Sequence, residues 1–135
     1  MAGTIVSDTI QNGAGASTST TNVVNGCAKA WLNYNGVTPT INASYNISSV
    51  TRNAAGDYTI NFTTGTFSDA NYSALLTSTN REINSNSNQT HGYYSTDNVN
   101  PTTYTSTACR ISMAKLVTST GVFYDMAVVS MAFFR

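Results

Sequence analysis

The sequence predicts an all-β protein: an antiparallel β-sandwich of jelly-roll-like type with an extended N-terminal arm. Residues 57–64, DYTINFTT, alternate so that Tyr58, Ile60 and Phe62 point to one side and short polar side chains to the other, as in a half-buried strand. Similar short segments recur about every eight to twelve residues with turn signals between them, which favours a sandwich over a parallel α/β sheet. No long segment has the 3.6-residue period of an amphipathic helix, so we expect very little helix.

Residues 1–26 are expected to form the arm. They include NGAGASTSTTN, whose small side chains bury too little apolar surface to order on their own. The preceding TIVSDTI has β-branched residues that suit a strand. We therefore expect an extended arm that docks on a neighbouring protein through Thr4, Ile5, Val6 and Ile10, with a flexible joint behind it. A disordered tail is the alternative.

Residues 27–135 are expected to form one head domain built from short strands. We assign the strands to residues 28–35, 39–46, 48–53, 57–64, 71–79, 104–116 and 123–134. Turn residues separate them at Asn35-Gly36, at Ala55-Gly56-Asp57, at 68–71 and at Thr120-Gly121.

The last strand differs from the others because it is apolar on both faces. Its sequence MAVVSMAFF includes Val129, Met131 and Phe133, which we assign to core or subunit packing. A strand that is apolar on both sides must be covered on both sides. Either it is central in the sandwich with a subunit packed behind it, or it ends inside an oligomer interface.

The composition predicts a protein that exists in an assembly. Charged residues make up 9% of the chain and the net charge is zero, whereas Asn, Ser and Thr account for 54 of the 135 residues. Ordinary domains carry about 25% charged residues, and like-charge repulsion normally opposes association. We therefore expect the uncharged outer faces to contact copies of the same chain. Six dispersed cations form no patch for nucleic acid.

The sequence shows no pattern for a signal peptide, a membrane helix or a metal site. The N-terminus has no basic region followed by a signal-peptide-length apolar stretch, and no window approaches the length of a membrane helix. We expect a soluble protein made in a cytoplasm, with no membrane insertion. Cys27 and Cys109 are the only cysteines; we expect them to be buried and free, with one disulfide as the alternative. No Cys/His cluster suggests a metal or cofactor.

The carboxylates do not predict an enzyme. Glycoside hydrolysis usually needs two carboxylates at a set separation. Asp57 and Asp69 have the sequence context of turn residues, and Asp8 lies in the arm. Glu82 and Asp97 flank a polar loop and can in principle face each other, although solvated loop charges are the favoured interpretation.

His91 is the only imidazole, and no GxSxG motif accompanies it. We interpret His91 as a hydrogen-bonding loop residue. In a trimer, three copies of it can instead surround a metal on the threefold axis. No second ligand is apparent nearby, so the prediction is no metal.

The polar loop at residues 81–103 has a composition suited to sugars. Tyr rings can stack on pyranose faces, and amides can hydrogen-bond to hydroxyl groups. The candidate contact residues are Asn86, Asn88, His91, Tyr93, Tyr94, Asp97 and Asn98. The simpler interpretation of either tyrosine alone is that it packs under its own loop. Trp31 lies in the first strand of the head, where we expect a core or interface anchor.

Part of the chain resembles a known module. Residues 28–36, AKAWLNYNG, are followed within residues 41–75 by ASYN, GDYT, NFT and DANY in that order. This middle third of the chain resembles a module of tail-fibre and related virion proteins of tailed bacteriophages. The resemblance implies a β-rich trimeric head at the distal end of a fibre, used in attachment. Together with the loop composition and the lack of a catalytic arrangement, it leads us to expect a non-enzymatic homotrimer on the virion that contacts host surface polysaccharide. The arm would then bind other virion proteins of the tail or capsid.

The chain departs from that pattern because it begins at Met1 with no shaft. We therefore expect a short fibre, a fibre tip carried by another protein, or a knob on the capsid or tail. Residues 81–103 and the last strand match nothing in the module and would vary with the target. Two alternatives remain: a capsid decoration or head-fibre protein without receptor binding, and a free lectin-like carbohydrate-binding module.

Overall fold

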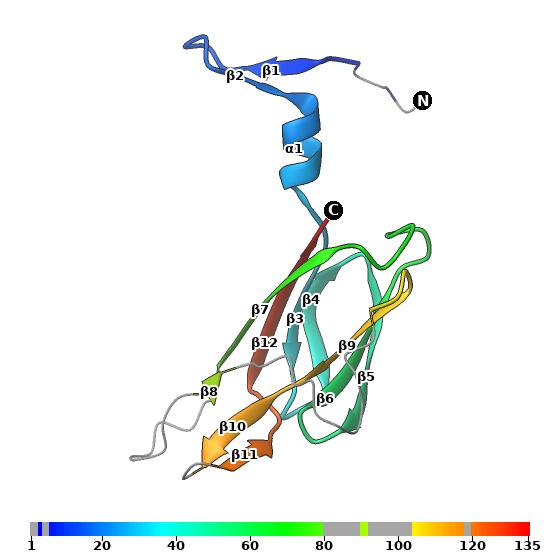
Figure 1. Ribbon diagram of the computed structural model, residues 1–135, viewed down its shortest axis with the longest axis vertical. Coiled ribbons are helices and arrows are strands. Elements are labelled where there is room, and N and C mark those ends of the chain that lie inside the picture. The colour runs from blue at the N-terminus through cyan, green and yellow to red at the C-terminus, as the bar shows by residue number, and fades with distance from the viewer. Residues whose placement is uncertain (1–2, 4–5, 80–89, 92–103, 118–119) are drawn as a thin grey trace.

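In the computed structural model the chain forms an antiparallel β-sandwich with an N-terminal segment standing off one end (Figure 1). The structure describes residue 3 and residues 6–79, 90–91, 104–117 and 120–135. One layer has the strand order β4-β3-β12-β7 and the other β5-β6-β9, and every pairing is antiparallel. The bounds are β3 Ala28–Asn35, β4 Thr40–Tyr45, β5 Ile47–Ala54, β6 Asp57–Phe62, β7 Ser73–Thr79, β9 Ala108–Ser112 and β12 Val128–Phe134.

The fold class is therefore the one that the sequence predicts, because period-2 alternation is a local property that survives in the folded strands. In β6, Tyr58, Ile60 and Phe62 are buried. In β12, Val129, Met131 and Phe133 are buried in the same way. β12 lies between β3 and β7, which makes it a central strand with one face on the core and its other face half-buried.

The core contains two aromatic groups. Phe62 packs with ring centroids 4.8 Å from Phe67, 5.4 Å from Tyr72 and 4.9 Å from Phe133. Tyr34 and Tyr58 meet edge-to-face at 5.4 Å. Such edge-to-face pairs contribute beyond the apolar area that they bury, so these rings hold the two sheets together.

A small third sheet lies at the end of the head remote from the N-terminal segment (Figure 1). Its order is β11-β10-β8, with β8 at Thr90–His91, β10 at Ala114–Val117 and β11 at Thr120–Phe123. Two sequence predictions are corrected here. Thr120 and Gly121 belong to β11 and pair with β10, so the predicted turn is misplaced. The two long C-terminal segments are each divided, at Met113 and at residues 124–127.

The N-terminal segment is not the extended arm that we expected. β1 (Thr9–Gln11) and β2 (Ser17–Ser19) form a hairpin, and α1 follows at Thr20–Gly26. The Ser19 side chain caps the helix by accepting the N–H of Asn22 at 3.1 Å. Thr, Asn and Val are weak helix formers, which is why the pattern alone did not predict α1. None of the residues in α1 is buried.

Cys27 is exposed and Cys109 is buried, and both thiols are free. The expectation that they are free is correct, but the expected burial holds only for Cys109. Burial raises the pKa of the Cys109 thiol to about 12. In the described ranges, no helix is long and apolar enough to cross a membrane.

Candidate functional site: the outer face of the four-stranded sheet

One row of apolar side chains crosses the outer face of the β4-β3-β12-β7 sheet. Tyr45 is paired with Trp31, Trp31 with Ala132, and Ala132 with Leu75. Tyr45 is 53%, Trp31 41% and Leu75 62% exposed. Directly opposed residues on neighbouring strands have side chains in contact range. We call these four residues the apolar row.

The position of Trp31 corrects the interpretation of this residue as a core anchor. In β3, Ala30, Leu32 and Tyr34 face the core. Period-2 alternation therefore places Trp31 on the opposite side, with Lys29 and Asn33. The alternation was visible in the sequence, but the size and apolar nature of tryptophan argued for burial. The core assignment is therefore wrong, and an interface or a binding role stays a prediction.

A row of amides and hydroxyls lies beside the apolar row. The Asn42 amide donates to the Asn33 Oδ1 at 2.8 Å, and the Asn33 amide donates to the Ser130 hydroxyl at 3.3 Å. These side chains belong to β4, β3 and β12. These two hydrogen bonds link the side chains across the strands, so the face combines exposed apolar surface with neutral polar side chains that bond to one another.

The outer face of the other sheet has a different chemistry. The Asn61 amide donates to Ser49 at 2.9 Å, and the Asn53 amide donates to Thr59 at 2.9 Å. The Arg110 guanidinium pairs with Asp57, and it holds the pKa of the Asp57 carboxyl below its usual range. No large exposed hydrophobic residue lies on the described strands β5, β6 and β9. The apolar surface is therefore confined to one of the two outer faces.

Six of the charged residues that the structure describes in the head form three ion pairs. Arg52 pairs with Asp125, Arg110 with Asp57, and Arg135 with Asp69. The Lys29 ammonium donates to the Val24 carbonyl near the end of α1. Among the described residues, Lys29 is the one charged side chain on the strand face that carries the apolar row.

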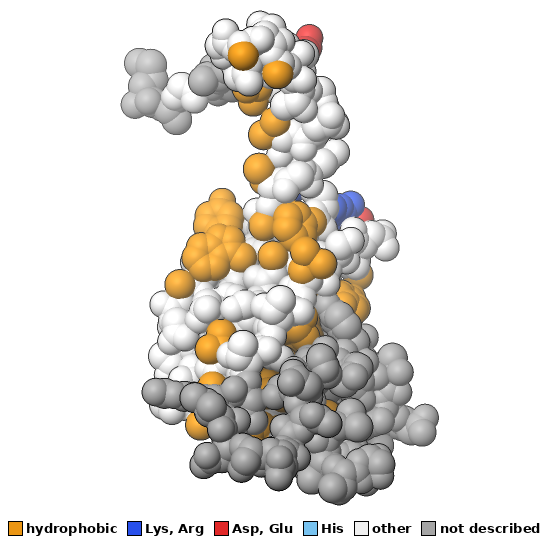
Figure 2. Space-filling view, turned by 90° about the vertical axis from the view of Figure 1, so that its left-hand side faces the viewer, with side chains coloured by type: hydrophobic (Ala, Val, Ile, Leu, Met, Phe, Trp, Pro, Cys, Tyr) orange, Lys and Arg blue, Asp and Glu red, His pale blue; other side chains and the backbone are white. Residues whose placement is uncertain are grey.

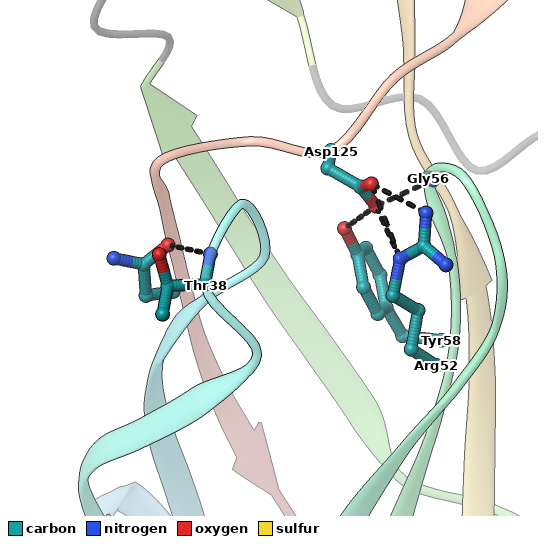
Figure 3. Close-up of polar contacts among 6 residues, drawn as sticks. Thr38, Arg52, Gly56, Tyr58 and Asp125 are labelled. Carbon is teal, nitrogen blue, oxygen red and sulfur yellow. Dashed lines mark hydrogen bonds and ion pairs between the residues drawn. The ribbon is translucent and has the colours of Figure 1, made fainter.

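Asp125 joins the β11–β12 connection to the second sheet (Figure 3). It accepts two hydrogen bonds at 3.1 Å from the Arg52 Nε and one at 2.7 Å from the Nη2. It also accepts the Gly56 N–H at 2.9 Å and the Tyr58 hydroxyl. Burial opposes ionisation of Asp125, but the hydrogen bonds from Arg52, Gly56 and Tyr58 outweigh it and keep its pKa below the usual range.

This group of residues acts as a structural clamp. Burial and the adjacent Asp125 raise the pKa of Tyr58, so its phenol stays protonated and remains a donor. The Tyr58 ring is buried, and the phenol and the guanidinium share one carboxylate acceptor. Each group is already bound to another, and the arrangement presents no free nucleophile or base. It fixes the distal end of the sandwich.

Asp125→Asn is expected to lower the free energy of unfolding at pH 7 by about 1.5–3 kcal/mol, because hydrogen bonds to a charged acceptor are lost. A carboxylate whose folded pKa is lowered stabilises the fold above its unfolded pKa, and this stability is lost as pH falls through the folded pKa. The difference in melting temperature between wild type and Asp125→Asn should therefore be large at pH 7 and shrink below about pH 4.

The matched control is Asp69→Asn, which removes the charge from a more exposed ion pair with Arg135. Exposed pairs contribute about 0–1 kcal/mol, and the Asn side-chain oxygen can still accept the backbone N–H of Asn71, which Asp69 accepts at 2.8 Å. Equal losses in the two variants at pH 7 would contradict the clamp. Melting curves across the pH range measure both.

Most of the predicted glycan-contact residues lie outside the described residues: Asn86, Asn88, Tyr93, Tyr94, Asp97 and Asn98. The Glu82–Asp97 pairing also lies outside them. For His91 the structure describes the backbone, which pairs with Ala114 as part of β8. This residue therefore lies in a strand and not in a loop. Within the described ranges, no group of three His, Cys, Asp or Glu side chains is placed to hold a metal ion.

Of the predicted arm-contact residues, Thr4 and Ile5 also lie outside the described residues. Val6 and Ile10 are exposed, and Ile10 lies in β1. A cleft of about 410 Å³ separates the end of α1 from the head. Its lining residues are Val24, Asn25, Lys29, Gly65, Thr66, Phe67, Ser68 and Arg135.

Comparison of the chain with protein-family models, with curated proteins and with solved structures finds no match.

Proposed function

We propose that this chain is a non-enzymatic structural protein on the surface of a tailed-phage virion. In this proposal it forms a short, fibre-like homotrimer. The N-terminal segment attaches it to other virion proteins, and the distal end contacts host surface polysaccharide. The support from sequence is the resemblance of residues 28–36 and 41–75 to tail-fibre modules.

The observation that carries the proposal is the apolar row in a chain with so little charge. Trp31, Tyr45 and Leu75 are large, exposed and arranged in one line across the sheet. Contiguous exposed apolar surface on a soluble domain commonly marks a protein interaction site. A chain with zero net charge and 9% charged residues has little repulsion to keep its copies apart. Both facts favour a protein whose function is to assemble.

The shape of the molecule supports separate roles for its two ends, one for attachment to the virion and one for contact with the host. The N-terminal hairpin and α1 stand at one end of the head, and the β11-β10-β8 sheet lies at the other (Figure 1). An attachment end and a contact end are thus separated by the length of the sandwich. The strand β8 lies within residues 81–103, the segment with the sugar-suited composition.

Light scattering of the purified protein tests the assembly directly. The expected mass at micromolar concentration is three times the 14.3 kDa of one chain. A monomer mass would contradict the homotrimer. Electron microscopy of virions carrying a C-terminal label tests the location, and an unlabelled virion surface would contradict the virion role.

Receptor contact requires a separate measurement. If residues 92–103 contact a host polysaccharide, deleting them should weaken binding of the purified protein to host cells while leaving its oligomeric state unchanged. Unchanged cell binding would favour a capsid decoration role instead. Glycan-array binding by a protein that never associates with virions would favour the lectin-like alternative.

A further inference from the structure

We propose that the outer face of the β4-β3-β12-β7 sheet is the surface through which copies of this chain pack around a threefold axis. In this arrangement, the Leu75 edge of one copy contacts the Trp31 and Tyr45 edge of the next. The inference rests on the proposed homotrimer and specifies which of its surfaces forms the contact.

The charge of the face restricts what can cover it. Lys29 is the one charged side chain among the described residues of the face, and it already donates to Val24. An acidic or basic partner would therefore find no complementary charge there. Another copy of the chain brings an equally uncharged surface, so that burial costs no unpaired charge.

The hydrogen bonds of the face argue against a sugar as the occupant. A glycan is held by amides and hydroxyls that are free to bond to it. Asn42, Asn33 and Ser130 bond to one another instead. From Trp31 the apolar row continues across two more strands, through Ala132 to Leu75. Neutral polar groups that already have partners, beside a long apolar row, match a protein interface.

The four-stranded face alone is too small for a standard interface, so the proposed contact surface also includes the N-terminal segment. Four strands spaced about 4.8 Å apart and six to eight residues long cover roughly 19 by 22 Å. This is about half of the ~800 Å² that one partner contributes to a standard interface. Figure 2 shows hydrophobic side chains on the upper head and others along the same side of α1 and the hairpin. Ile10 of β1 and Val24 of α1 are exposed, and in this arrangement they extend the contact.

The N-terminal elements also need such a contact. A helix of seven residues is well below the length at which isolated helices are stable in water. A two-stranded hairpin alone is marginal at best. Neither element has a buried residue in the single chain. Packing between neighbouring N-terminal segments in a parallel assembly would supply the missing burial.

The apolar row is unequal at its two ends, so it offers two different patches of the kind that the interfaces of a cyclic trimer join. Tyr45 and Trp31 make one end aromatic, Leu75 makes the other end aliphatic, and the small Ala132 lies between them. A twofold contact uses the same patch on both copies. A cyclic trimer instead places one end against the other, because its interfaces join two different patches. The small central residue allows three such faces to approach a common axis.

Leu75→Lys tests which face forms the contact. Leu75 is exposed, so a charge there should leave the fold intact, while a buried and unpaired charge at every interface should prevent assembly. We expect the mass to fall threefold, to that of one chain, with an unchanged circular dichroism spectrum. The matched control is Thr51→Lys, on the outer face of the other sheet, which should remain trimeric.

The two-ended contact is tested by charge pairing. Tyr45→Glu alone should also give monomers, and the double variant Leu75→Lys/Tyr45→Glu should recover trimers at low salt. Within one chain these positions lie three strand spacings, roughly 14 Å, apart. A recovered trimer must therefore pair them between chains, and added salt should weaken it.

Each result separates this inference from the proposed function. A monomeric wild type contradicts the homotrimer itself. A trimeric wild type whose Leu75→Lys variant is still trimeric overturns the assignment of this face alone. Monomeric single variants that stay monomeric when combined overturn the end-to-end contact around a threefold axis.

Discussion

Gly56→Ala is expected to destabilise the protein by about 4 kcal/mol or more, which is a large part of the 5–15 kcal/mol that stabilises a typical domain. Gly56 lies in the β5–β6 turn with φ +67°, a left-handed conformation that costs other residues about 1–2 kcal/mol. An added Cβ would also lie 2.7 Å from the Tyr124 nitrogen and 2.9 Å from its oxygen, and close against the Met113 carbonyl.

These neighbours are backbone atoms of other segments, so they cannot move aside without breaking hydrogen bonds. The Gly56 carbonyl accepts the Met113 N–H at 2.6 Å, and its N–H donates to Asp125 at 2.9 Å. The substitution therefore disturbs the clamp as well as the turn. Urea denaturation should show a much lower midpoint, and poor soluble yield is expected.

Gly65→Ala is the matched control. Gly65 has a similar φ of +84°, but an added Cβ there would meet nothing within 4 Å. Its cost should be the conformational penalty alone, about 1–2 kcal/mol. If the two variants lost the same free energy of unfolding, crowding around Gly56 would contribute little. That result would contradict the close approach of the Met113 and Tyr124 backbone described above.

Phe62→Ala is expected to cost about 3–5 kcal/mol, the range for aromatic-to-alanine changes in protein cores. Phe62 is buried and contacts Phe67, Tyr72 and Phe133 with ring centroids 4.8–5.4 Å away. Removing its ring leaves a cavity between the two sheets and ends three ring contacts at once. Thermal unfolding at one fixed protein concentration measures the loss, since assembly makes the melting temperature concentration-dependent.

The control for this variant is Phe123→Ala, which removes the same ring from an exposed position at the distal end. Its cost should be under about 1 kcal/mol, as for most surface substitutions. If the two variants melted at the same temperature, the aromatic group around Phe62 would not be the support between the sheets that its packing indicates.

Local alternation was enough to predict several strands and their buried sides. Residues 28–35 match β3 at both ends, and the inward positions of β6 and β12 follow directly from their period of two. The turn around Gly56 was also predicted, because Gly and Asp signal a turn wherever they separate two strand patterns.

Features that depend on weak local signals were harder to predict. The helix α1 is made of Thr, Asn and Val, whose helix propensity is low, and its start depends on one Ser19 cap. The hairpin of β1 and β2 lies in a Gly- and Ser-rich stretch whose composition favours disorder. Trp31 was assigned to the core or an interface from its size, and only the sheet shows that it faces outward.

What the sequence alone determined is the β class, the inward side of the better strands and the scarcity of charge. These depend on neighbouring residues or on totals, so no knowledge of distant contacts is needed. The tertiary structure decided which strands are neighbours. It brought Asp125 to Arg52 and Tyr58 across a long sequence separation, and it aligned Tyr45, Trp31, Ala132 and Leu75 from four strands into one row. The physical reason is that the period of a strand sets which side chains share its face, whereas the order and register of strands depend on the packing of the whole core.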